Sequence, residues 1–400
     1  MRPSAPEPRS GLPLSFVLRD FYFLGFFGLG VYAPYLSLFL RSRGLSGAEV
    51  GAVWALLPLG AVVAPPLWGI VADKFRNRRV LIAALTAAAG LIFSGLLAAE
   101  GFLLLALIGF LFSAFRTSVL PLVESATLEH LARRENEGDG TRPAAYGRYR
   151  LWGSVGFIAA SLSIGYLVDA FSIRAMVYVF LVGAGLQVLL ALALPPEGKT
   201  SRPRLGREIR ALLRRPAFAA FLAAGFVLRT SHGAYWTFLP VRMKALGLSG
   251  WAIGWSFSVG VAAEMVFLLF SRPILDRLGP RTLLTAAAGA AAVRWWLYTL
   301  ARGPWDFMAI ALLHALTFAA YHVAGVRFVD RCTPASLKSS GQAFFGAATY
   351  GAGGIAGAVL AGLLFEPLGI TGLFYTSAAV ALLSGAIYWI AIPPRASPPP

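Results

Sequence analysis

The 400-residue chain is poor in charge, in acidic residues and in cysteine. Charged residues make up only 13% of it, and only 18 residues are acidic. The single cysteine, Cys332, excludes an internal disulfide and a cysteine-based metal site. Hydrophobic residues reach 58% and the mean hydropathy is +0.69, far from the composition of an ordinary soluble domain. Scarce charge with abundant apolar residues indicates an all-α membrane protein.

Long apolar runs occupy most of the chain. A helix needs about 20 apolar residues to cross the hydrocarbon core of a bilayer. We predict twelve transmembrane helices, at about residues 17–40, 50–72, 79–99, 102–124, 149–169, 174–194, 217–243, 251–275, 282–301, 305–329, 340–365 and 369–392. The polar segments between these runs are too short to form a soluble domain. They predict cytoplasmic tails at residues 1–16 and 393–400 and a basic cytoplasmic linker at residues 195–216.

The net charge of +17 invites a nucleic-acid partner, but its distribution argues against one. With the N-terminus inside, most lysines and arginines fall in loops on the cytoplasmic side. This asymmetry is the positive-inside pattern of an inner-membrane protein with both termini in the cytoplasm. We therefore expect the lipid bilayer as a partner and no nucleic acid, for a chain that works as a monomer and needs no cofactor.

The chain contains an internal repeat. Gly44-Leu-Ser-Gly-x-x-x-Gly51 recurs 203 residues later as Gly247-Leu-Ser-Gly-x-x-x-Gly254, and other pairs share this offset. The repeat predicts two six-helix halves, 17–194 and 217–392. An even number of helices per half keeps both in one orientation, related by an axis normal to the membrane. A substrate site is then expected near the midplane between the halves.

Ionisable residues lie inside the apolar runs of the second half. A charge at membrane depth is costly and marks a substrate, proton or ion path by default. Glu264, Arg294 and His314 fall near the middle of three consecutive predicted helices. Their pairing would compensate the desolvation of each group, and the alternative is a static ion pair that fixes helix packing. We predict proton coupling by Glu264 and His314, and substrate binding by Arg294.

Further residues are candidates for a polar cavity lining. His232, Tyr235 and His322 stand among aromatic residues, and we predict that they bind substrate. The alternative is that the histidines are packing residues with satisfied hydrogen bonds. His314 and His322 are eight residues apart, too far for a helical i, i+4 chelate, so we expect no metal site.

The candidate charged residues within or at the ends of the spans are Arg116, Arg150, Arg229, Arg294, Glu124 and Glu264. Glu124 and Arg150 form a second candidate substrate-binding pair, although helix ends also collect topology charges. Arg116 and Arg229 lack an obvious acidic partner, so each could bind a carbonyl, snorkel or contact substrate. The excess of cations favours an anionic or strongly hydrogen-bonding solute.

The loop after the second span reads Gly69-x-x-x-Asp73-Lys-x-Arg-x-Arg78-Arg. This resembles the G-x-x-x-D-[RK]-x-x-x-[RK]-[RK] signature of the major facilitator superfamily, and Asp276 and Arg281 repeat part of it. A carboxylate and arginines at helix ends can hold one side of a transporter shut and release it. We predict that Asp73, Arg78, Asp276 and Arg281 form a cytoplasmic gate. The alternative is a topology signal alone.

The second-half motifs resemble the phenylpropionate-permease branch of that superfamily, which is related to lactose permease. Three sequence segments carry the resemblance: Val261-Ala-Ala-Glu264, Arg294-Trp295 and Leu313-His314-x-x-Thr317-Phe318-x-x-x-His322. It implies the major facilitator fold, with Glu124 and Arg150 at sugar-binding positions and Phe157 at a ring-stacking position. It also implies that Glu264 couples substrate to proton. A carboxylate of lactose permease is replaced here by Thr317, so proton coupling must shift, and sugar specificity is in doubt.

These observations predict a secondary active transporter that works by alternating access, with proton-coupled symport of a small organic solute. An aromatic or other organic acid is the first choice, and a sugar or nucleoside is the alternative. A polytopic membrane enzyme or a non-transporting sensor is the alternative from another class. We predict no enzyme activity, because the sequence has no paired nucleophile and base, no metal-spaced cluster and no phosphate-binding loop.

Overall fold

The computed structural model describes residues 13–74, 77–136, 144–194, 212–334 and 337–393. Most of the predicted tails and of the basic linker lies outside these residues. The contacts between residues divide the chain into two compact units. The first holds residues 1–39 and 60–201, and the second holds residues 40–59 and 202–400.

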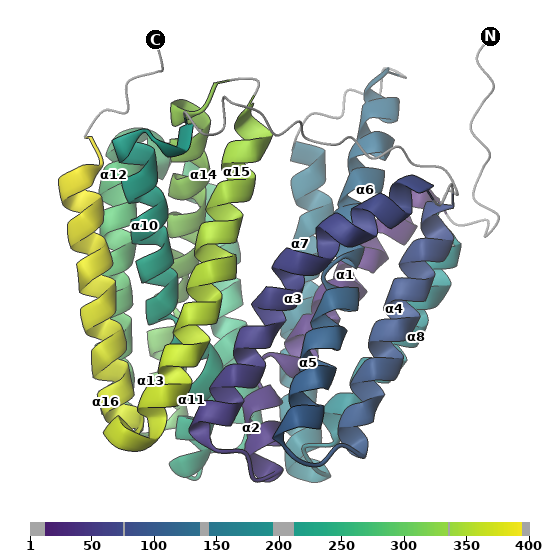
Figure 1. Ribbon diagram of the computed structural model, residues 1–400, viewed down its shortest axis with the longest axis horizontal. Helices are drawn as coiled ribbons and strands as arrows, with labels where there is room; N and C mark the ends of the chain where they lie inside the picture. The colour runs from purple at the N-terminus through teal and green to yellow at the C-terminus, as the bar shows by residue number, and fades with distance from the viewer. Residues whose placement is uncertain (1–12, 75–76, 137–143, 195–211, 335–336, 394–400) are drawn as a thin grey trace. The chain divides into compact units, whose positions relative to one another are not determined.

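The first unit is a bundle of helices around a buried apolar core. Its helices are α1 (Leu14–Tyr32), α4 (Arg78–Ser94), α5 (Phe102–Arg116), α6 (Val119–Asn136), α7 (Ala144–Ala170) and α8 (Ala175–Leu192). A 3-10 turn, η1 (Gly95–Leu97), follows α4. Helix α1 packs against α7 and α8, and α4 packs against α8 and α5 (Figure 1). Val17, Phe21 and Ile82 are almost fully buried in this core, as expected for apolar stripes that face other helices.

The second unit is also a bundle of helices, in which the last helix contacts several of the others. Its helices are α10 (Pro216–Ser231), α11 (Gly233–Ala245), α12 (Gly250–Leu300), α13 (Pro304–Ala311), α14 (Tyr321–Cys332), α15 (Lys338–Gly346) and α16 (Gly354–Ala391). Two π-helical segments, η2 (Ala315–Ala320) and η4 (Ala347–Gly353), interrupt the helices. Helix α16 runs beside α10 and α12 (Figure 1).

Within the described residues, nine helices or continuous helical stretches are long and apolar enough to cross a membrane. Two of the nine, Gly250–Leu300 (α12) and Lys338–Ala391 (α15 to α16), each contain two spans joined at a glycine with positive φ, at Gly279 and Gly369. The predicted span at residues 217–243 is divided at His232 into α10 and α11. Each of these two helices is shorter than the nine stretches, so neither is among them. Together these helices account for the twelve predicted crossings. The predicted all-α membrane fold is confirmed.

The repeated sequence motif forms a repeated turn. Gly44 and Gly247 have φ of 81° and 77°, a region that glycine enters without a steric penalty. The next residue donates its N–H five residues back, from Leu45 to Leu40 at 3.3 Å and from Leu248 to Met243 at 3.1 Å. This is the Schellman pattern that ends a helix. The motif is repeated because each copy ends one helix and starts the next.

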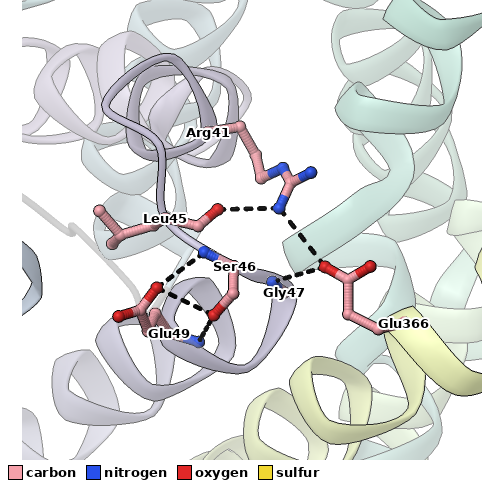
Figure 2. Close-up of polar contacts among 6 residues, drawn as sticks. All are labelled: Arg41, Leu45, Ser46, Gly47, Glu49 and Glu366. Carbon is pink, nitrogen blue, oxygen red and sulfur yellow. Dashed lines mark hydrogen bonds and ion pairs between the residues drawn. The ribbon is translucent and has the colours of Figure 1, made fainter.

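Helix α2 (Leu36–Ser42) ends at the first of these turns, and α3 (Gly47–Lys74) begins there. The side chain of Glu49 accepts the N–H of Ser46 at 2.8 Å, and the Ser46 hydroxyl accepts the N–H of Glu49 at 3.3 Å. This reciprocal pair is a capping box. Figure 2 shows that Glu366 of α16 accepts the N–H of Gly47 at 3.1 Å and pairs with Arg41 at 3.5 Å. The start of α3 is therefore bound to α16.

Candidate functional site

Among the described residues of the second unit, Arg294, on the second part of α12, is a fully buried cation. Its side chain has no exposed surface. One terminal nitrogen donates to the Thr317 hydroxyl at 3.0 Å and contacts Nδ1 of His314 at 3.1 Å, and the other donates to the Tyr298 hydroxyl at 3.3 Å. His314 and Thr317 are three residues apart, so they project from one side of their helix toward the guanidinium.

The position of Arg294 determines which ring nitrogen of His314 carries the proton. A guanidinium has only donors, so Nδ1 of His314 must be the acceptor. The other nitrogen, Nε2, then carries the hydrogen of a neutral imidazole, and it lies 3.6 Å from Oε2 of Glu264. The Glu264 side chain is 17% exposed, whereas Arg294 is sealed. Glu264, His314 and Arg294 thus form a chain from a partly exposed carboxylate to a fully buried cation.

Aromatic rings enclose the cation. The guanidinium carbon of Arg294 lies 4.3 Å from the centre of the Tyr235 ring and 5.6 Å from that of Tyr298. Tyr235 stacks on Tyr298 and on His314, with ring centres 6.2 Å apart in both pairs. Ring faces attract a cation most strongly where water is excluded. Tyr235, one of the predicted substrate-binding residues, is 2% exposed and contacts Arg294 directly.

The other predicted histidines occupy different environments. His232 is 4% exposed, and its Nδ1 donates to the Leu228 carbonyl at 2.9 Å. Its ring meets Trp295 edge to face at 4.9 Å. His322 is exposed, and its Nδ1 lies 3.1 Å from the Tyr350 hydroxyl. The Arg229 guanidinium lies 5.6 Å from the ring centres of Trp236 and Tyr350.

The first-half candidates lie in the first unit. The Tyr146 hydroxyl donates to Glu124 at 3.1 Å, and the Arg150 guanidinium lies 3.8 Å from the centre of the Phe26 ring. Each charge is therefore held by an aromatic residue. Phe157 is 5% exposed, on the part of α7 where its backbone meets Gly30 of α1.

Three predicted gate residues have described partners at helix ends. Arg78 forms a two-pronged ion pair with Glu129 of α6, at 2.9 and 3.0 Å. Asp276 accepts from Arg327 at 3.4 Å, and Arg281 donates to the Trp389 carbonyl and lies over its ring. The backbone of Asp73 belongs to α3, and its side chain lies outside what the structure describes.

Sequence reasoning missed several partners in these sites. Tyr298 follows Arg294 by four residues, a spacing that places both on one helix face. This spacing could have predicted the contact between them. Glu129 is one of several acids near the end of α6, and nothing in the sequence selects it as the partner of Arg78. Gln187, a buried amide on α8, was not considered. In the described residues, no three His, Cys, Asp or Glu side chains gather in a group that could hold a metal ion.

Comparisons with known proteins agree with this architecture. Residues 16–376 match the MFS_1 like family. The chain is 30% identical to the maltose permease of Geobacillus stearothermophilus over 362 residues, 89% of each chain. It is also 30% identical to the "Probable 3-phenylpropionic acid transporter" of Escherichia coli (strain K12) over 376 residues, 90% of this chain and 93% of that one. The crystal structure of the nucleoside transporter NupG superposes with a TM-score of 0.83 at 20% identity, covering 95% and 99% of the two chains.

The chain therefore belongs to the MFS_1 like family of the major facilitator superfamily. The predicted resemblance to that superfamily is confirmed. The protein is a membrane-spanning transporter of a small molecule, because its family and its structural neighbours are transporters rather than enzymes.

Proposed function

We propose that the protein is a proton-coupled symporter of a small organic acid, with an aromatic acid as the first choice. The chain from Glu264 through neutral His314 to Arg294 carries this proposal. Glu264 takes up the proton, because it is the carboxylate of the group and its side chain is partly exposed. Protonation removes the negative charge that faces the His314 ring. The electrostatic balance at Arg294 then favours a substrate anion as its new partner.

The remaining assignments are part of the same proposal. Glu124, Arg150, Phe157, His232, Tyr235 and His322 contribute to substrate binding. Asp73, Arg78, Asp276 and Arg281 form the cytoplasmic gate, and the ion pair of Arg78 with Glu129 is the contact that supports it. The protein works as a monomer in the inner membrane, with both termini in the cytoplasm. Its two halves are residues 17–194 and 217–392.

A sugar or nucleoside symporter is the second candidate. It is supported by the 30% identity to a maltose permease and by the likeness to the fold of NupG. The two candidates differ in the charge of the solute. Arg294, with no exposed surface and a neutral histidine beside it, favours the anion.

A transport screen tests the proposal. Purified full-length protein in liposomes that contain a pH-sensitive dye receives aromatic acids, sugars and nucleosides in separate runs. Internal acidification with one panel, faster than in protein-free liposomes, is the expected result for symport, and it names the substrate class. The protein-free liposomes are needed because a neutral weak acid crosses the bilayer unaided and releases its proton inside. Uptake of labelled acid without acidification would refute proton coupling, and uptake of sugars or nucleosides alone would refute the acid.

A further inference from the structure

The first unit contains a cavity of about 240 Å³ that none of the predicted site residues lines. It lies between α1, the end of α5 and α8. Its wall includes the aromatic rings of Phe21, Phe26 and Tyr32. Its polar lining includes Arg116 and Gln187. The cavity therefore combines an apolar body with two polar groups.

Arg116 brings a cation to this cavity. One of its terminal nitrogens donates to the Gly25 carbonyl of α1. A guanidinium has five N–H donors in a planar fork, so one carbonyl leaves most of its hydrogen-bonding capacity unused. In the part of the chain that the structure describes, no carboxylate lies within ion-pair distance of Arg116. A cation at membrane depth without a counter-ion is costly and calls for an anionic partner.

Gln187 supplies a second, independent observation. Its side chain is 3% exposed, and its Nε2 has no hydrogen-bond partner among the described residues. This nitrogen would lie 3.5 Å from a methyl group placed on Gly25, the residue whose carbonyl binds Arg116. Buried polar groups in proteins almost always have partners, so an unpaired donor in a cavity wall points to a ligand. Gln187 and Arg116 thus bring hydrogen-bond donors to the same stretch of α1.

We propose that this cavity binds the carboxylate of a small aryl-alkanoate, with its carboxylate oxygens on Arg116 and Gln187 and its ring among Phe21, Phe26 and Tyr32. A dry cavity of about 150 Å³ accepts benzene, so about 240 Å³ holds a ring with a short acidic chain. The inference rests on the proposed function and adds to it a cation of the first unit that contacts the acid, in addition to Arg294 of the second unit.

Equilibrium binding tests the site without any ion gradient. Calorimetry on the purified full-length protein measures binding of benzoate, phenylacetate, 3-phenylpropionate and 4-phenylbutyrate, each paired with its neutral primary amide. The wild type should prefer acid to amide, with an optimum at one chain length. Arg116→Gln should weaken acid binding by about tenfold to a hundredfold and change amide binding little, because the charge-assisted bonds are lost.

Gln187→Glu is the second variant, because Arg116→Gln also removes the link to Gly25 and could lower stability. The new carboxylate should pair with Arg116 and repel the ligand, so acid binding falls by about tenfold or more while the melting temperature holds or rises. Arg174→Gln, exposed at the start of α8, and Gln342→Glu, on the other glutamine of the chain, are matched controls. Neither should change the preference for acid.

The outcomes separate this inference from the proposed function. Acid preference that survives both Arg116→Gln and Gln187→Glu would make Arg116 a structural link to α1 and overturn the site alone. Acid binding that depends on Arg116, in a protein whose uptake brings no proton, would leave the site standing and remove the coupling. A wild type that binds none of the acids would overturn the site and the choice of an aromatic acid as the substrate.

Discussion

Gly51 of α3 and Gly362 of α16 meet backbone to backbone. A methyl group on Gly51 would lie 2.6 Å from Cα of Gly362 and 2.5 Å from the carbonyl oxygen of Ala358. A methyl group on Gly362 would lie 2.9 Å from Cα of Gly51. Small residues permit such close helix contacts, in which dispersion and weak hydrogen bonds act over many atoms. Both residues belong to the second unit, where Glu366 also binds the start of α3.

Gly51→Ala should destabilise the protein by about 1–3 kcal/mol, because the added methyl forces the two helices apart. Gly69→Ala is the matched control on the same helix, since a methyl there meets nothing within 4 Å. The control should be neutral or slightly stabilising. Thermal unfolding in detergent measures both. Equal melting temperatures for the two variants would contradict the close packing of α3 on α16.

Thr317→Val should cost about 1–2 kcal/mol of stability, because it removes an acceptor from the buried Arg294 at nearly constant shape. Thr317→Ser keeps the hydroxyl and should lose less. The control is Thr376→Val on α16, where the hydroxyl donates only to a carbonyl of its own helix, that of Gly372. Denaturant titration in detergent gives the three values. If Thr317→Val and Thr376→Val lowered the free energy of unfolding equally, the hydrogen bond from Arg294 to Thr317 would make no net contribution to stability.

Repeats and depth could be predicted from the sequence, because they depend on position along the chain. The copied glycine motif predicted two related halves, and its two copies form the same turn at Gly44 and Gly247. Glu264, Arg294 and His314 were selected because they lie near the middle of consecutive spans, and the structure brings them into one chain.

Side-chain direction could not be predicted in the same way. Glu124 and Arg150 were predicted as a pair, yet each contacts an aromatic residue, Tyr146 and Phe26. The unpaired amide of Gln187 depends on which face of α8 meets α1, and one apolar span with a single polar residue does not reveal that face. His232 has the aromatic neighbours expected of a cavity, but its bond to the Leu228 carbonyl arises from the break between α10 and α11.

Arg294→Lys should weaken substrate binding by about tenfold or more. A lysine ammonium is a point charge on a flexible stem, and it cannot hold the geometry that joins His314, Thr317 and Tyr298 to one planar group. Arg302→Lys, on the loop before α13, is the control. Binding is measured with the solute that the transport screen identifies. Unchanged affinity, with a lowered melting temperature, would make Arg294 a packing residue.

The same substitution in two ion pairs should give different losses. Glu129→Gln should cost about 1–3 kcal/mol, because it leaves Arg78, whose side chain is 6% exposed, without its full counter-ion. Glu366→Gln should cost less than about 1 kcal/mol, since Glu366 is 59% exposed and Arg41 is 36% exposed. Chemical unfolding of the two variants compares them. A larger loss at Glu366 would show that burial does not set the value of these pairs.

Glu264→Gln should abolish concentrative uptake and leave exchange of substrate between the two sides of the membrane. Glutamine keeps the size and a hydrogen-bonding group near His314, but it cannot release or accept the transported proton. During exchange, the protein opens to one side of the membrane and then to the other with substrate bound at each crossing. Exchange therefore requires no net movement of a proton. Uptake driven by an imposed pH gradient and counterflow with both sides loaded are measured in the same liposomes.

Glu100→Gln, which changes an exposed carboxylate in the loop before α5, is the control and should retain both activities. If Glu264→Gln still concentrated its substrate at the wild-type rate, the proton would be carried elsewhere. Loss of both activities in folded protein would instead assign Glu264 to substrate binding.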